Sequence, residues 1–363
     1  MKKVFLALLM IGCFASVSQA QFLIGGRAAG MGGAGTAAVT DISAAYYNPA
    51  ALMRSPVKAA ELNLSLGGEY TDPTDLSNAI SKATSPADFL ANNYNKTLNF
   101  RGSVNGIVGL NIRKIGISLL PVANISTGKA ANSMIGTFSG AGMYAGVLTL
   151  GRTFGVNYLP AALDVGLNVK LLSASNGTLT TTGTALTAAG TAAYGTGSGI
   201  GFDVGALTSV SVPMVTEMKV GFVVRDLMQS INYKNKTKTS TLDYSTGTAV
   251  VTDLPETNAP DSTQNFNPSY VLGASAVVPG IGLLAALDYE MTASGSNTHL
   301  GIEYPLFFNL ILLRAGLATG TGLSMTTFGA KLNLPLIQIE GAAATDANNQ
   351  GASAYTVAVN IGF

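Results

Sequence analysis

The last segment of the chain carries the pattern that decides the fold. Residues 355–363 read YTVAVNIGF, in which apolar side chains take every second position from Tyr355 to Phe363 and small or polar ones fill the positions between. Because successive side chains of a β-strand point to opposite faces, the pattern predicts a strand with one apolar face. In a barrel that spans a membrane, such a face points at lipid and the other lines the lumen.

The same alternation recurs along the chain and predicts fourteen strands. They lie near 58–70, 100–113, 115–125, 137–151, 161–175, 196–211, 215–231, 267–278, 281–292, 297–304, 309–317, 322–333, 336–345 and 351–363. The connections between them alternate, with long loops at 71–99, 126–136, 176–195 and 232–266 on one side and tight turns on the other. This arrangement is typical of outer-membrane proteins. We therefore expect an all-β fold, a 14-stranded antiparallel transmembrane barrel with both termini in the periplasm.

The composition supports a membrane barrel. Only 11% of the residues are charged, against about 25% in soluble domains. Beyond the first residues no run of roughly 18 apolar residues occurs, so no transmembrane helix is predicted. A closed barrel is the other structure that pairs every backbone group in lipid.

The first residues have the form of a secretory signal. Two lysines precede an apolar core, and Ser18-Gln19-Ala20 offers a cleavage site that makes Gln21 the mature start. Cys13 offers the alternative of a lipoprotein signal. The expected mature chain holds 18 basic and 19 acidic residues and no cysteine. It has no basic surplus for nucleic acid and no thiol chemistry.

A glycine-rich segment follows the signal. Residues 25–52 read GGRAAGMGGAGTAAVTDISAAYYNPAAL, and Gly30, Gly32 and Gly35 match the spacing of a dinucleotide-binding motif. The context excludes that site, because no strand precedes the motif and no acid follows about 20 residues on. Small residues instead let a segment pack tightly inside a narrow space.

This segment carries a resemblance to a known family. GRAAGMGGAG at 26–35, Asp41 and AYYNPA at 45–50 resemble the start of mature proteins of the FadL-like superfamily, in particular its PorV-type branch. The resemblance implies a fourteen-stranded barrel, formed here by 56–363, with residues 21–55 folded inside it as a hatch. The residues that match the hatch motif are Gly30, Gly32, Gly33, Asp41, Asn48 and Pro49.

Charged residues on the polar strand faces are expected to line the lumen. They are Asp164, Asp203, Asp288, Glu290, Glu303 and Glu340, with Arg113, Lys170, Lys219, Arg225, Arg314 and Lys331. The expected pairs are Asp203 with Lys219 or Arg225, Glu303 with Arg314, and Lys331 with Glu340. They form either a polar pathway for solute or, as we favour, paired charges that line the wall and hold the hatch, since an unpaired charge away from water is costly. The balance of signs argues against a strongly ion-selective pore.

Pro121 lies well inside the third predicted strand, where it removes a backbone donor. The resemblance implies that a break in this strand opens the wall sideways to the bilayer. The alternative is a proline near the end of the strand, beyond the hydrogen-bonded belt. Lys234, Lys236 and Lys238 alternate along one predicted loop, as a partner surface or as a rim that contacts lipopolysaccharide phosphates.

The sequence offers no enzyme site. Its single histidine, His299, has no nucleophile in a distinctive context and no cysteine nearby, so we expect neither catalysis, nor a metal site, nor a cofactor. The favoured function is a FadL-like outer-membrane channel for hydrophobic, fatty-acid-like molecules. The first alternative is a PorV-like protein that docks secretion partners, and the second is a sealed structural protein of the outer membrane.

Overall fold

The computed structural model describes residues 23–54, 58–69, 85–112, 114–155, 162–213, 215–347 and 352–362. The expected signal peptide, residues 1–20, lies outside these ranges, as does Arg113. No helix within them is long and apolar enough to cross a membrane.

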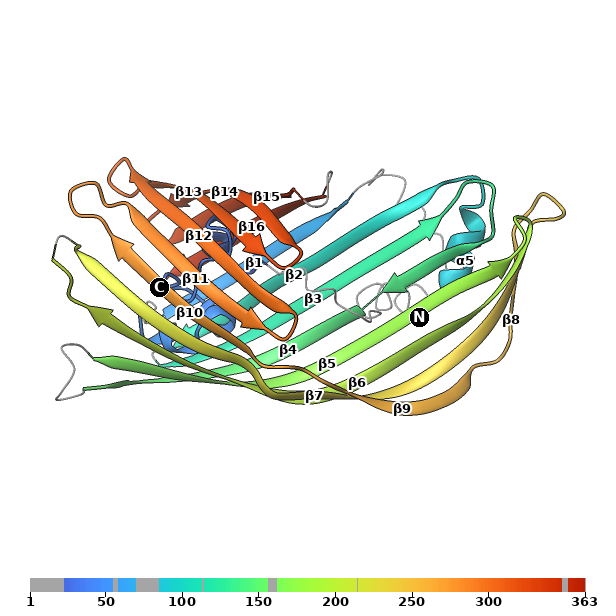
Figure 1. The fold of residues 1–363 in the computed structure, drawn as a ribbon, viewed down its shortest axis with the longest axis horizontal. Helices are drawn as coiled ribbons and strands as arrows, with labels where there is room; N and C mark the ends of the chain where they lie inside the picture. The colour runs from blue at the N-terminus through green and yellow to red at the C-terminus, as the bar shows by residue number, and fades with distance from the viewer. Residues whose placement is uncertain are drawn as a thin grey trace.

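The described chain forms one antiparallel sheet with four short helices (Figure 1). The strands are β1 (Lys58–Glu69), β2 (Leu98–Ile112), β3 (Ile115–Lys129), β4 (Gly136–Phe154), β5 (Leu163–Gly183), β6 (Thr187–Val210), β7 (Glu217–Asp243), β8 (Val250–Asp253), β9 (Thr257–Asn265), β10 (Ser269–Val277), β11 (Leu284–Thr292), β12 (Gly295–Leu306), β13 (Ile311–Gly320), β14 (Leu323–Asn333), β15 (Ile337–Asp346) and β16 (Ala352–Gly362). The helices are α2 (Gly26–Gly30), α3 (Ala44–Tyr47), the 3₁₀ helix η1 (Pro49–Arg54) and α5 (Pro86–Asn92).

The sheet closes on itself through two pairings. The last strand, β16, pairs with β1, and the lower part of β7 pairs with β10. The closed ring therefore contains β1–β7 and β10–β16, which are fourteen strands. This agrees with the number predicted from the alternation of side chains.

Strands β8 and β9 lie outside the ring and pair with the upper part of β7. Here "upper" denotes the end of the barrel that carries α5, which lies at the right in Figure 1, and "lower" denotes the opposite end, at the left. The ring strands β2–β7 extend upward beyond β10–β16, so one wall of the barrel is much taller than the other (Figure 1).

Two segments that were predicted to be loops form strands in the tall wall. Residues 176–195 form the paired ends of β5 and β6 around a turn at 184–186, and residues 232–266 contain the upper part of β7 with β8 and β9. Most side chains of these extensions are polar or small, and large apolar ones such as Leu179 and Leu242 are too few to continue the alternation that marks the other strands. Their threonines still favour strands, because β-branched side chains suit a pleated surface.

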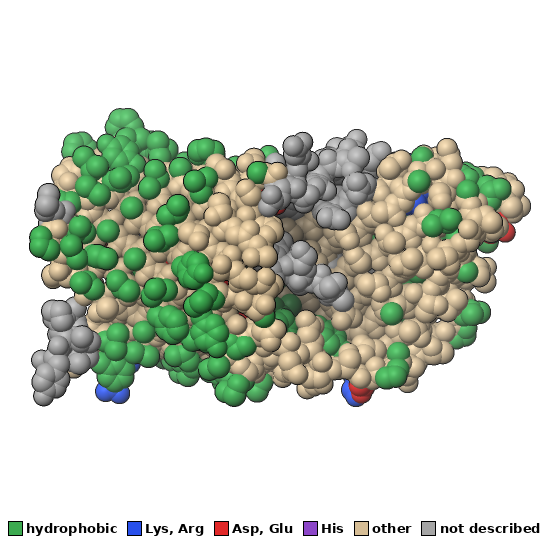
Figure 2. Space-filling view, viewed as in Figure 1, with side chains coloured by type: hydrophobic (Ala, Val, Ile, Leu, Met, Phe, Trp, Pro, Cys, Tyr) green, Lys and Arg blue, Asp and Glu red, His purple; other side chains and the backbone are tan. Residues whose placement is uncertain are grey.

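The outer face of the ring is an apolar belt. Side chains such as Leu110, Ile117 and Leu171 are 49%, 62% and 66% exposed, while the polar residues between them point inward. Figure 2 shows hydrophobic side chains crowded over the half of the molecule that contains β10–β16 and few over the extended half. A closed barrel with an apolar outer belt and a polar interior is a transmembrane barrel.

The tall wall is covered on its outer face above this belt. Leu167, Leu171 and Leu179 share one face of β5, and the ladder between β4 and β5 runs without a bulge. Leu167 and Leu171 are exposed, whereas Leu179 is buried in a cluster with Phe89 and Leu90 of α5. Helix α5 therefore lies on the same sheet face as the apolar belt and shields its upper continuation from water.

The N-terminal segment, residues 23–54, crosses the inside of the ring. Helix α2 contacts β13–β16, and η1 contacts β4–β6 on the other side. Glycines of the wall strands let the backbone of the N-terminal segment pack directly against the backbone of the wall. A Cβ at Gly316 would lie 2.2 Å from the backbone nitrogen of Gly32, and one at Gly166 would lie 2.2 Å from the carbonyl carbon of Pro49.

We predict that Gly316→Ala lowers the free energy of unfolding, measured by urea titration in micelles, by about 1–3 kcal/mol because the added methyl overpacks the contact with Gly32. Gly146→Ala is the matched control, since a Cβ there meets only one atom, at 3.9 Å. Equal stability of the two variants would show that the N-terminal segment does not pack against the wall at Gly316.

Candidate functional site

A cavity of about 440 Å³ lies in the lumen between the N-terminal segment and the upper end of the barrel. Its apolar lining includes Ile24, Leu120, Met143, Leu172, Ile231 and Phe266. Tyr46 and Tyr233 add two aromatic rings. The junction of β9 with β10 and the hairpin of β11 with β12 also line it, through Phe266, Asn267, Thr292 and Ala293. Its size and mostly apolar lining suit a small hydrophobic molecule.

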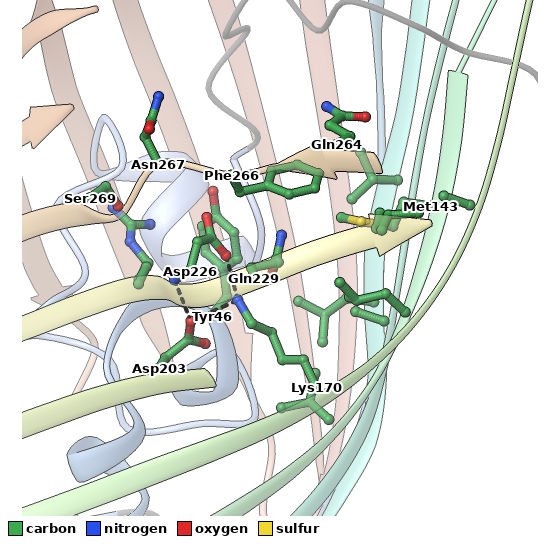
Figure 3. Close-up of a pocket in the computed structure, with 18 of the residues that line it drawn as sticks. Tyr46, Met143, Lys170, Asp203, Asp226, Gln229, Gln264, Phe266, Asn267 and Ser269 are labelled. Atoms are coloured by element: carbon green, nitrogen blue, oxygen red, sulfur yellow. Dashed lines mark hydrogen bonds and ion pairs between the residues drawn. The ribbon is translucent and has the colours of Figure 1, made fainter. Parts of the chain in front are cut away.

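Asn48 fixes the part of the N-terminal segment that forms the base of the cavity. Its side-chain amide donates to the carbonyls of Thr36 (3.0 Å) and Ala206 (3.1 Å), and its Oδ1 accepts from the backbone of Ala50 (3.0 Å). These bonds tie the end of α3 to β6. Because Tyr46 lies two residues earlier in α3, they also set the place of its ring beneath the cavity (Figure 3).

The other residues of the expected hatch motif make structural contacts. Gly32 donates its backbone N–H to Thr327 (2.8 Å), and its carbonyl lies 2.7 Å from Nδ1 of His299. Gly32 and Gly33 have φ angles of +67° and +87°, which favour glycine. Gly30 accepts from Thr327 (3.1 Å), and Asp41 accepts from the backbone of Ser43 (2.9 Å).

A second anchor of the segment involves a lumen acid. Asp288 accepts from the backbone N–H groups of Gly35 and Thr36, each at 2.8 Å. The spacing that resembles a dinucleotide motif thus presents its N–H groups to a carboxylate of the wall. Anchoring by Asn48 and by Asp288 makes the segment part of the wall of the site.

Charged groups form one side of the cavity (Figure 3). Lys170 lies 2.6 Å from Asp203 and 2.5 Å from Asp226. Arg225 pairs with Glu290, and its guanidinium lies 5.2 Å from the centre of the Tyr46 ring. The expected pairing of Asp203 with Lys219 or Arg225 is therefore wrong.

The arrangement of the strands explains why Asp203 pairs with Lys170. Lys170 faces Asp203 from the neighbouring strand β5, while Lys219 lies lower on β7 and pairs with Glu217 at 3.0 Å. Two irregularities of the β6–β7 ladder lie between Ile200 and Val204 and shift the register there. Asp226 and Met228 have φ angles of 59° and 54° at these irregularities.

The irregular part of β7 is where the strand changes partners. Below it Arg225 pairs with Ser269 of β10, and above it Ser230 pairs with Asn265 of β9. Asp203 accepts the backbone N–H of Asp226 at 2.8 Å, which holds the bulge in place. The side chain of Asp226 is thereby directed at the cavity. Hydrophobic alternation does not reveal a bulge, so this residue could not be predicted from the alternation.

A buried ion network holds the lower part of the segment. Arg314 lies 2.7 Å from Glu303 and 2.5 Å from Glu340, and Lys331 lies 3.3 Å from Glu340, so these two expected pairings are confirmed. The sequence reasoning missed Arg27, which lies 2.5 Å from Glu303, and Arg54, which lies 2.6 Å from Asp164. As basic residues inside an otherwise small and apolar segment, they could have been matched to the lumen acids.

Pro121 lies within β3 and pairs with Tyr144 of β4. On its other side the ladder with β2 is interrupted. The pairs Asn105–Val122 and Val108–Leu119 are formed, but none joins Gly106 and Ile107 to Leu120 and Pro121. Leu120 and Val122, on either side of the proline, both line the cavity.

The lysine row on the extension is neutralised by acids. Lys234 pairs with Asp261, Lys236 with Glu256 at 3.0 Å, and Lys238 with Asp253. Hydrogen bonds from Tyr194 and Lys236 lower the pKa of Glu256 below its ordinary value, so this carboxylate is ionised at neutral pH. The row is thus a set of exposed ion pairs on strands, in place of the expected basic loop.

Several solved structures have a fold similar to that of this chain. The toluene transporter TbuX of Ralstonia pickettii matches with a TM-score of 0.61 at 13% identity, over 93% of this chain and 98% of its own. The Pseudomonas putida toluene transporter TodX matches at 0.58 and 12%, over 93% and 96%. A Pseudomonas aeruginosa FadL homologue matches at 0.58 and 13%, over 97% and 100%. The chain therefore has a FadL-like barrel fold.

No protein-family model matches the sequence, and no curated protein matches it either. Within the described ranges no group of three or more His, Cys, Asp or Glu side chains is arranged to hold a metal ion.

We predict that Arg314→Met destabilises the barrel strongly. The substitution removes the cation between Glu303 and Glu340, and breaking a buried pair costs about 3–5 kcal/mol. Lys236→Met, which breaks the exposed pair with Glu256, is the control and should cost no more than about 1 kcal/mol. Unfolding free energies in micelles measure both, and similar losses would contradict a holding role for the buried network.

Proposed function

We propose that the protein is an outer-membrane channel for the uptake of small hydrophobic compounds, with the N-terminal segment as its hatch. The observation that carries the proposal is the 440 Å³ cavity, with its apolar and aromatic lining, in the lumen directly above this segment. The FadL-like fold supports it, since solved structures that share the fold include toluene transporters. In this proposal both termini lie in the periplasm and the tall wall faces outward.

The proposed path has an entrance and a lateral exit. A compound enters past Phe266, at the junction of β9 with β10, and rests against Tyr46 and Leu172. It leaves where the ladder between β2 and β3 is interrupted beside Pro121. A lateral exit delivers an apolar compound to lipid without a passage through water, which the hydrophobic effect opposes. The hatch stays in place along this path, in keeping with its anchors at Asn48 and Asp288.

Filling the cavity should abolish uptake. Ala174 lines the cavity and is 7% exposed, so Ala174→Trp places an indole in the space that the ligand needs. We expect the uptake of radiolabelled toluene by cells that produce this variant to fall to the level of cells without the protein. Ala189→Trp, at an exposed position of β6, is the control and should leave uptake unchanged. Toluene uptake by the filled variant at the level of the unmodified protein would refute the proposal.

The lateral exit has a test of its own. Pro121→Ala returns a backbone N–H to β3 at the interruption, and we expect the ladder with β2 to close there. Toluene should still bind to purified protein in micelles, while its uptake by cells should fall several-fold. Uptake that equals that of the unmodified protein would place the exit elsewhere.

A second candidate function is PorV-like docking of secretion partners. The tall wall favours it, because β9 pairs only with β7 among the described strands and leaves a strand edge beyond the ring. Mass spectrometry of gently purified protein separates the candidates. Retained polypeptides without a small ligand would support docking, a retained apolar compound would support uptake, and neither would favour a sealed structural protein.

A further inference from the structure

We propose that the cavity takes uncharged hydrophobic molecules and rejects carboxylates, and that Asp226 is the residue that sets this preference. The inference rests on the proposed uptake function and narrows it. The resemblance to the FadL-like superfamily suggested fatty-acid-like cargo, whose head group is an anion at neutral pH. The charges that line this cavity do not suit such a head group.

The described residues that line the cavity carry more negative than positive charge. They include the two bases Lys170 and Arg225 and the three acids Asp203, Asp226 and Glu290. With all five ionised, the site has a net charge of −1. The field of such a site repels an approaching anion, and the low polarity of the surrounding walls strengthens the effect.

Both cations are already engaged. Lys170 lies between the carboxylates of Asp203 and Asp226, at 2.6 Å and 2.5 Å. Arg225 pairs with Glu290 and lies against the face of Tyr46. A carboxylate ligand would have to displace one of these acids or remain without a partner, and an unpaired buried charge is costly. A neutral molecule requires neither.

Asp226 differs from Asp203 in its exposure and its contacts. The side chain of Asp203 is 3% exposed and also accepts from Asn168 and from the backbone of Asp226, so it holds the wall together. The side chain of Asp226 is 35% exposed. Asp226 is therefore the acid that a ligand meets, and its amide isostere removes one negative charge while its backbone stays tied to Asp203.

The remaining lining suits a neutral ligand. Met143, Leu172 and Phe266 offer apolar contact, and Gln229 and Gln264 offer uncharged hydrogen-bonding groups at the same cavity (Figure 3). A hydrocarbon or an alcohol with a single polar group can use both kinds of contact.

The test compares two ligands of the same shape and different charge. Equilibrium dialysis of the full chain in neutral micelles, with empty micelles subtracted, measures binding of 4-butylbenzyl alcohol and of 4-butylbenzoate at a pH where the benzoate is ionised. We expect the alcohol to bind at least about tenfold more tightly. In Asp226→Asn the benzoate should gain several-fold while the alcohol is unchanged. Asp261→Asn, which removes an equal charge from an exposed pair on the extension, should leave the ratio as it is.

If Asp226→Asn does not fold, a second measurement on the unmodified protein tests the inference. With the unmodified protein, binding of the benzoate should approach that of the alcohol when the pH falls below the pKa of the ligand. Equal binding of alcohol and ionised benzoate, or an unchanged ratio in a folded Asp226→Asn, would overturn the inference and leave the uptake function standing. Failure of both ligands to bind would overturn the uptake function as well.

Discussion

Inside a bilayer a backbone group without a hydrogen-bond partner costs several kcal/mol, so a sheet in lipid has to close. Here closure depends on the lower part of β7, which pairs with β10 after the chain has passed through β8 and β9. The upper part of β7 then needs another partner, and β9 supplies it. The change of partner requires a bulge at Asp226 and Met228, and this bulge lies at the cavity. The need to close the sheet thus places an acidic side chain where a ligand would rest.

The interior of the ring follows from the same constraint. The strand face that meets lipid is apolar, so the charged side chains point inward and need partners there. The N-terminal segment supplies some of these partners. Arg27 and Arg54 pair with acids of the wall, and backbone N–H groups of the segment bind Asp288. It fits because the facing backbones approach at glycines such as Gly166 and Gly316. What remains of the lumen above the segment is the candidate site.

Hydrophobic alternation was enough to predict the fourteen-stranded ring, because every ring strand crosses lipid and must show one apolar face. It failed at the upper ends of β5, β6 and β7, where neither face meets lipid and polar residues such as Thr180 and Thr239 interrupt the apolar alternation. The pairing of Glu303 with Arg314 could be predicted from neighbouring strands. The pairing of Asp203 with Lys170 also joins neighbouring strands across a regular ladder. The bases expected from β7 do not reach Asp203, because the β6–β7 ladder is irregular there and alternation does not reveal the irregularity. The cavity is lined by residues of distant strands and of the N-terminal segment. No local sequence pattern predicts that these residues meet.

The most direct test of the account is a crystal structure of the protein soaked with bromobenzene, in which the anomalous signal of bromine locates the ligand. If the lumen cavity binds small hydrophobic compounds, a bromine peak will lie inside the lumen between Tyr46, Leu172 and Phe266. Bromine peaks confined to the outer apolar belt, with the lumen cavity free of bromine at saturating ligand, would contradict it.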